Sequence, residues 1–180
     1  MEGQSSDLPR KTVEPIALAA GVPPRTLQQF LSGAKWDQGA MRDQGAMRDQ
    51  VQRVVARDHA HPLAVGVIDE TSYPKKGDKA PGVKRQYCGA TGKTDNCAVT
   101  VHLAYATPDV SDPSGGFRAL LDGELFLPED WSADRERCRA CGIPDSVGHR
   151  TKWRVALGLL DRAGGNGVVL PWLTFDEGYT

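Results

Sequence analysis

The first part of the chain has the spacing of helices. Between residues 12 and 32, apolar side chains recur every three or four positions, with Gly21 and then Pro23-Pro24 between two such stretches. Gly ends helices and Pro begins them, so this pattern predicts two short helices joined by a tight turn. Two helices joined in this way form a helix-turn-helix outline. We therefore expect a small helical N-terminal region, helix-turn-helix-like, over residues 1–60.

The rest of the chain, residues 61–180, has the spacing of an α/β domain. Continuous apolar runs at 63–68 and 168–175 predict strands buried on both faces. Three further strands are predicted at 85–91, 97–106 and 120–127. Helical spacing is found at 132–141 and 151–163. The turn at 92–96 predicts an antiparallel pair. We expect the two apolar strands to be parallel neighbours joined through the 151–163 helix, as a right-handed crossover.

A perfect hexapeptide repeat interrupts the helical pattern. Residues 37–42 and 43–48 both have the sequence Asp-Gln-Gly-Ala-Met-Arg. Six residues are too few for a solenoid unit, so the repeat indicates a local duplication. Each copy also carries a glycine, which weakens a helix by about 1 kcal/mol. We expect local disorder or a helix register misfit here.

Composition excludes several classes. The 180 residues are 39% hydrophobic with a net charge of −1, as in ordinary globular proteins. No apolar run approaches the roughly 20 residues that span a bilayer, and the N-terminus lacks the apolar core of a secretory signal. The four cysteines suit a reducing cytoplasm better than a disulfide scaffold. We expect a cytoplasmic protein without a membrane partner.

Charge is concentrated between Pro74 and Lys93, where six cations face only Asp78. A charge run is usually a solvated loop. The alternative is a surface that contacts nucleic-acid phosphates, and its candidate residues are Lys75, Lys76, Lys84 and Arg85.

Each of the two apolar runs ends in an acid, Asp69 and Asp176. The carboxyl edge of a sheet is where α/β ligand sites form. If the two strands are parallel neighbours, the carboxylates come together and favour a divalent cation such as Mg²⁺ or Mn²⁺. The alternative is that each Asp caps a turn.

Two other motifs give weaker evidence for a functional site. Residues 89–94 suggest a phosphate-binding loop, but Tyr87 stands where that motif requires its first Gly. Cys138 and Cys141 form a lone Cys-x-x-Cys without a second pair at zinc spacing. We interpret the first as a hairpin turn and the second as incidental thiols.

Longer motifs carry a resemblance over about residues 10–179. They are residues 67–77, 82–97, 121–128, 131–135 and 172–179, with the N-terminal block from 11–16 to 30–32. Together they resemble the DDE-type transposases of bacterial insertion sequences. The resemblance implies a ribonuclease H-like mixed sheet, with Asp69 as the first catalytic acid and metal ligand and Asp176 as the second. It also implies Mg²⁺ or Mn²⁺ as cofactor, transposon ends as the DNA partner, and homo-oligomers in the intact family.

The sequence departs from the family's pattern at its end. The third acid, a Glu on a later helix, has no counterpart before Thr180. We therefore expect an incomplete sheet and a truncated transposase fragment that is inactive alone, although the intact protein would cleave and join DNA by two-metal phosphoryl transfer. The alternatives are a non-catalytic DNA-binding or interfering fragment, and a non-functional remnant.

Overall fold

The computed structural model describes residues 12–33, 44–108 and 116–176, and the chain divides into two compact units, Met1–Gln44 and Gly45–Thr180. The division comes earlier than the expected boundary after residue 60. Helix α5 (Gln44–Asp58) accounts for the difference, because its Val55 belongs to the core of the second unit.

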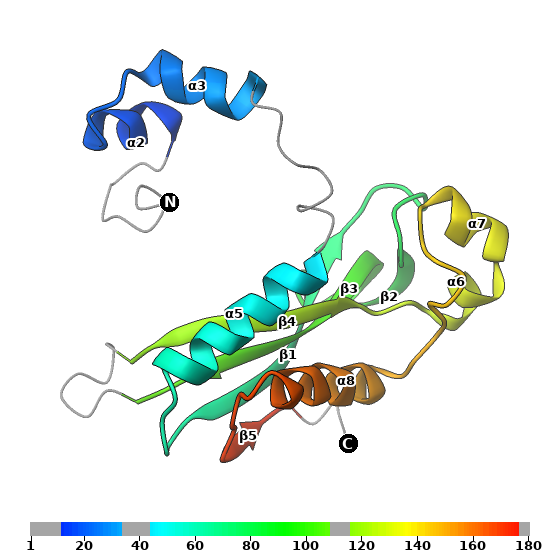
Figure 1. Ribbon diagram of the computed structural model, residues 1–180. Coiled ribbons are helices and arrows are strands. Elements are labelled where there is room, and N and C mark those ends of the chain that lie inside the picture. The colour runs from blue at the N-terminus through cyan, green and yellow to red at the C-terminus, as the bar shows by residue number, and fades with distance from the viewer. Residues whose placement is uncertain (1–11, 34–43, 109–115, 177–180) are drawn as a thin grey trace. The chain divides into compact units, whose positions relative to one another are not determined.

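The first unit contains two helices, α2 (Val13–Ala19) and α3 (Pro24–Gly33), as the apolar spacing predicts (Figure 1). After α2 the chain turns at Gly21, whose φ is +65°. The Val22 N–H donates to the Ala17 carbonyl at 2.9 Å, which closes the end of the helix. A left-handed backbone at this position favours glycine, so the stop signal has a direct cause.

The second unit is built on a five-stranded mixed sheet. Its strands are β1 (Val65–Pro74), β2 (Lys84–Cys88), β3 (Lys93–Ala106), β4 (Arg118–Leu125) and β5 (Trp172–Thr174). The order is β2-β3-β1-β5, and β4 also pairs with β3 (Figure 1). β1 is antiparallel to β3 and parallel to β5, and β2 is antiparallel to β3. The expected mixed sheet, parallel pair and antiparallel hairpin are confirmed.

The strand ends differ from the prediction. β1 continues to Pro74, so Asp69 lies within the strand and not at its end. β5 covers only three residues, and its Trp172 is 62% exposed, so this segment is not buried on both faces. Pro171, which has no N–H to donate, precedes the short strand. The hairpin turn occupies residues 89–92 instead of 92–96, with φ +66° at Gly92.

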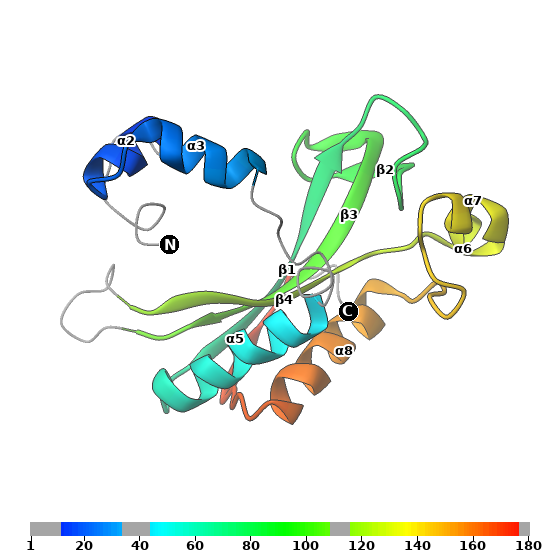
Figure 2. The same ribbon diagram turned by 45° about the horizontal axis from the view of Figure 1, so that its top comes forward.

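Helices α5 and α8 (Lys152–Gly165) pack on one face of the sheet (Figure 2). α8 buries Val155, Ala156, Leu159 and Ala163 against core residues of β1, β3 and β4. The sequence predicts a face that includes Trp153 and Leu157, but these side chains are 44% and 50% exposed. The helix itself is predicted correctly, whereas its buried face is rotated from the expected one.

The predicted helix at 132–141 is two helices, α6 (Glu129–Ala133) and α7 (Arg135–Ala140). Asp134 separates them, and its carboxylate accepts a hydrogen bond from the Arg137 N–H at 3.0 Å. An Asp in this position caps the second helix and so ends the first. None of the helices in the described part of the chain is long and apolar enough to span a membrane.

An ion-pair network joins the two large helices to β4. The Asp122 side chain is inaccessible to solvent and contacts Arg48 of α5 at 3.2 Å and Arg162 of α8 at 2.8 Å. Arg162 also contacts Glu124 at 3.1 Å, and Arg150 forms an ion pair with Glu124. Two carboxylates on β4 are therefore neutralised by three guanidinium groups.

The hexapeptide repeat contributes to this network through its second copy. Residues 44–48 of that copy form the start of α5 without a break, and Arg48 is its last residue. The first copy, where a misfit or disorder was also expected, lies outside the described residues.

Candidate active site and nucleic-acid interface

The two predicted catalytic acids follow the same pair of neighbouring strands. β1 and β5 are parallel, and Val67 pairs with Thr174 at the end of their ladder. Asp69 lies two residues beyond Val67 within β1, and Asp176 lies two residues beyond the last residue of β5; both are exposed. Parallel strands are about 4.8 Å apart, so continuing this register would set the two carboxylates side by side.

The Asp69 side chain faces away from the helices. Side chains alternate along a strand, and Ile68 points into the core under α8. Glu70 takes the same side as Ile68 and forms an ion pair with Lys152 at the start of α8. The acidic pair Asp69-Glu70 is thus divided between the two faces of the sheet, and Asp69 alone is on the open one. Its Oδ1 accepts a hydrogen bond from the Glu70 N–H at 2.7 Å.

His102 is a neighbour of Asp69 that the sequence analysis missed. It pairs with Asp69 across β1 and β3, and with Gly123 across β3 and β4. A Cβ on Gly123 would lie 2.6 Å from His102 Nδ1, so the imidazole occupies the space that the glycine leaves. Val99, Val101 and Leu103 alternate along the sequence, which places His102 on the opposite face of the strand. This alternation is the signal from which His102 could have been predicted.

His102 contacts a hydroxyl on its own strand. Nε2 lies 2.6 Å from Thr100 Oγ1, and the tautomer of the ring sets which of the two donates. Nδ1 is buried and has no hydrogen-bond partner among the described residues. Burial lowers the pKa of His102, and the Asp69 carboxylate opposes this shift. The imidazole is therefore neutral at pH 7.

The residues present suit a hard divalent cation in part. Asp69 and Asp176 supply carboxylate oxygens, which Mg²⁺ prefers, and Mg²⁺ usually keeps several water ligands. No cluster of three or more His, Cys, Asp or Glu side chains placed for a metal occurs among residues 12–33, 44–108 and 116–176. The two acids would supply only part of the ligand shell of such an ion, and other oxygen ligands would have to complete it.

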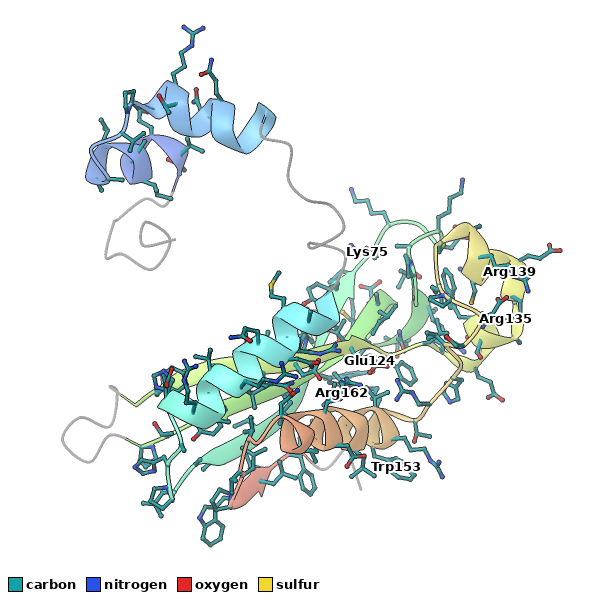
Figure 3. All side chains as sticks on the ribbon, viewed as in Figure 1. Lys75, Glu124, Arg135, Arg139, Trp153 and Arg162 are labelled. Carbon is teal, nitrogen blue, oxygen red and sulfur yellow. The ribbon has the colours of Figure 1, made fainter. Side chains whose placement is uncertain are left out.

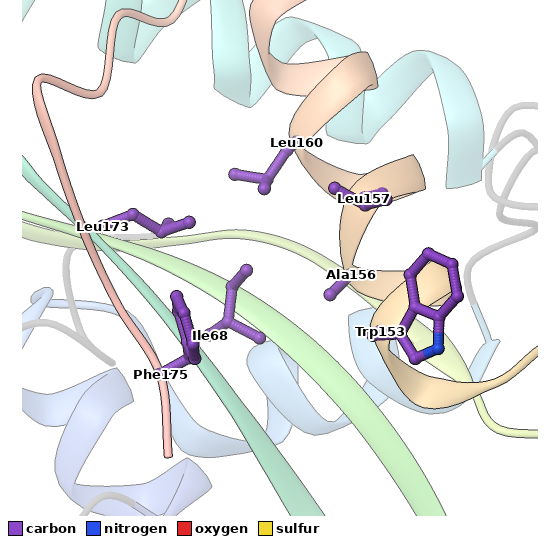
Figure 4. A pocket seen from close by; sticks show the side chains of 7 residues that line it. All are labelled: Ile68, Trp153, Ala156, Leu157, Leu160, Leu173 and Phe175. Carbon is purple, nitrogen blue, oxygen red and sulfur yellow. The ribbon is translucent and has the colours of Figure 1, made fainter. Parts of the chain in front are cut away.

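An apolar groove lies on the helix side of the same strands (Figure 4). Its volume is about 310 Å³, and it is lined by Ile68, Trp153, Ala156, Leu157, Leu160, Leu173 and Phe175. Ile68 and Phe175 directly precede the two acids in sequence. The face of α8 that carries Trp153, Ala156, Leu157 and Leu160 forms one wall of this groove.

The basic segment begins where β1 ends. Residues 75–83, here called the lysine loop, connect β1 to β2, and Lys75, Lys76 and Lys79 are exposed on it (Figure 3 labels Lys75). The four predicted phosphate contacts are not equivalent. Lys75 and Lys76 lie on the loop and Arg85 is exposed on β2, whereas Lys84 forms an ion pair with Asp130 at 3.2 Å. Lys84 is thus partly neutralised.

The two weaker motifs have structural roles. Residues 89–92 form the β2–β3 turn. Cys138 is buried and donates to the Trp131 carbonyl, and Cys141 donates to the Lys79 carbonyl at 3.2 Å. Both thiols therefore stabilise the α6–α7 segment and its contact with the lysine loop.

A mixed sheet in which one acid lies on β1 and a second follows the neighbouring parallel strand β5 is consistent with the class of ribonuclease H-like nucleases. The family of DDE superfamily endonucleases matches residues 2–180, and the chain belongs to this family. A similar protein is the probable transposase for insertion sequence element IS701 of Microchaete diplosiphon, 39% identical over 103 residues. That match covers 56% of this chain and 26% of the relative. No solved structure matches the chain.

Proposed function

We propose that this chain carries the first two acids of a transposase that cleaves and joins DNA at the ends of an insertion sequence. The observation that carries the proposal is the parallel register of β1 and β5, which leads to Asp69 and Asp176 at equivalent positions. The family and the transposase relative support DNA as the substrate. Homo-oligomers are an expectation for the intact family, as the resemblance implies. The four free thiols favour a cytoplasmic site of action.

The roles follow from the placement of the side chains. Asp69 and Asp176 would hold Mg²⁺ or Mn²⁺, which when bound polarises a phosphate and activates a water or a 3′-hydroxyl. The Glu70 N–H fixes one oxygen of Asp69 and leaves the other for a ligand. Lys75 and Lys76 would bind DNA phosphates beside the strand that carries Asp69, because β1 leads directly into the lysine loop.

For the 180-residue chain by itself we propose DNA binding without cleavage. Its described residues offer two acids at the site and an exposed basic loop. The exposure of the lysine loop favours a DNA-binding or interfering role as the second candidate. A remnant without function would bind DNA neither specifically nor through this loop.

Gel shifts on a short duplex over a range of salt concentrations test the binding. We expect affinity to fall steeply with salt, and Lys75→Ala with Lys76→Ala to reduce the slope by about one unit per lost phosphate contact. Lys84→Ala should reduce it less, because Lys84 already pairs with Asp130. An affinity for DNA that changes neither with salt nor on substitution of the two loop lysines would contradict the proposed interface.

Nicking of supercoiled plasmid with Mg²⁺ or Mn²⁺ tests the catalytic part. We expect no nicking by the chain alone. Nicking that disappears in Asp69→Ala would show that the site is already complete, and would require a further ligand such as Glu177.

A further inference from the structure

Side chains from other parts of the second unit form hydrogen bonds with the backbone of the lysine loop along much of its length. The Asn96 side-chain amide donates to the Lys75 carbonyl at 2.8 Å and to the Gly77 carbonyl at 2.9 Å. The Lys75 N–H in turn donates to the Asn96 carbonyl at 2.8 Å. Both N–H groups of the amide are used, so one side chain of β3 sets the path of the first three loop residues.

The α6–α7 segment holds the rest of the loop. Trp131 is fully buried, and its Nε1 donates to the Val83 carbonyl at 2.7 Å. Arg137 donates to the Asp78 carbonyl, and Cys141 to the Lys79 carbonyl. The guanidinium of Arg137 also stacks on the Trp131 ring at 3.6 Å. Five loop carbonyls are thus bound by side chains of β3, α6, α7 and the residue that caps α7.

We propose that Asn96 is a positioning residue for DNA binding, which holds the lysine loop in the shape that presents Lys75 and Lys76 to phosphates. The inference rests on the proposed DNA-binding function. With its carbonyls tied to β3, α6 and α7, the loop directs its charged side chains to solvent. A preformed site loses less conformational freedom on binding than a flexible loop would.

Asn96→Ala distinguishes the effect of loop position on DNA binding from the effect of loop charge, because it removes the two hydrogen bonds to the loop and no charged group. We expect the duplex to bind about three- to tenfold more weakly, a loss of preorganisation, with an unchanged salt slope. Lys75→Ala instead lowers the slope by about one unit. The matched control is Gln86→Ala, whose amide donates to the Cys97 carbonyl at 3.0 Å in the same hairpin and to no loop residue in the described structure. It should bind DNA as the wild type does.

Trypsin provides a measurement without DNA, since Lys75, Lys76 and Lys79 are its cleavage sites. We expect cleavage in the lysine loop to be several-fold faster in Asn96→Ala than in the wild type or Gln86→Ala, as local opening becomes easier. Trp131→Phe, which removes the donor at the other end of the loop and keeps the charge, should act in the same direction in both assays.

The inference is overturned if Asn96→Ala binds DNA within twofold of the wild type, if its salt slope falls as in Lys75→Ala, or if its loop is cut no faster. A wild-type chain that shows no salt-dependent binding would overturn the proposed function as well. If the wild type binds DNA and Asn96→Ala binds it equally well, only the positioning role of Asn96 is overturned.

Discussion

Two pairs of acids on the same sheet have opposite surroundings. Asp122 and Glu124 of β4 face the helices, and three arginines contact them. Asp69 and Asp176 lie at the exposed end of the β1–β5 pair, and Asp69 accepts a single backbone N–H in addition to its neighbours. A carboxylate enclosed by guanidinium groups stabilises the fold, whereas an exposed carboxylate is accessible to a hydrated cation. The two pairs of acids therefore differ first in their exposure to solvent.

The largest difference between the pairs should appear in stability. Asp122→Asn leaves Arg48 and Arg162 without their buried partner, and we expect the free energy of unfolding to fall by about 3 kcal/mol. Asp69→Asn, at an exposed site, should change it by less than about 0.5 kcal/mol. Urea unfolding of the two variants measures both. Equal losses would show that the two pairs do not differ as described.

The arginines of α5 offer a second contrast, because only some of them face the sheet. Arg48→Ala removes one partner of Asp122, and we expect a loss of about 1–2 kcal/mol in the free energy of unfolding, less than for Asp122 because the arginine is partly exposed. Arg53→Ala, at an exposed position further along the same helix, is the control and should cost less than about 0.5 kcal/mol. The same loss in both variants would contradict a stabilising contact between Arg48 and Asp122.

A smaller effect concerns pH near Asp69. Because burial lowers the pKa of His102, the unfolded chain takes up a proton near pH 6.5 more readily than the folded one. Stability is then full above about pH 7 and decreases as the pH falls through about 6.5. We expect His102→Gln to reduce this decrease, measured by urea unfolding between about pH 5 and 7.5. An identical pH dependence in variant and wild type would exclude His102 as its source.

The topology could be predicted from the sequence, because apolar runs, alternation and turn residues are local. The parallel β1–β5 pair, the β2–β3 hairpin and the helices of the first unit were found in this way. The length of β5 was overestimated, since its apolar residues lie at an exposed edge. Apolar spacing predicted helix α8 correctly. It did not predict which side of α8 is buried, because that depends on where the neighbouring strand β5 lies.

The placement of the two acids was predicted in part, whereas their role as a site stays a prediction. The strand pattern leads to both acids, but the separation of Asp69 from Glu70 depends on which face carries α8. The alternation along β3 marks the face of His102 but not its neighbours, and no local pattern marks Asn96, which acts through contacts with the lysine loop. The neutralisation of Lys84 by Asp130 likewise depends on the position of α6.

The central claim is that Asp69 and Asp176 form one cation site, and paramagnetic broadening by Mn²⁺ tests it most directly. In amide NMR spectra of the full chain, low Mn²⁺ should broaden the signals around both acids together, because a single ion would lie near Asp69 within β1 and near Asp176 after β5. Asp69→Asn and Asp176→Asn should each abolish the broadening of both segments. Glu70→Gln, whose carboxylate pairs with Lys152 on the other face, should leave it intact. Broadening that persists in Asp69→Asn, or that affects only one of the two segments, would contradict the claim.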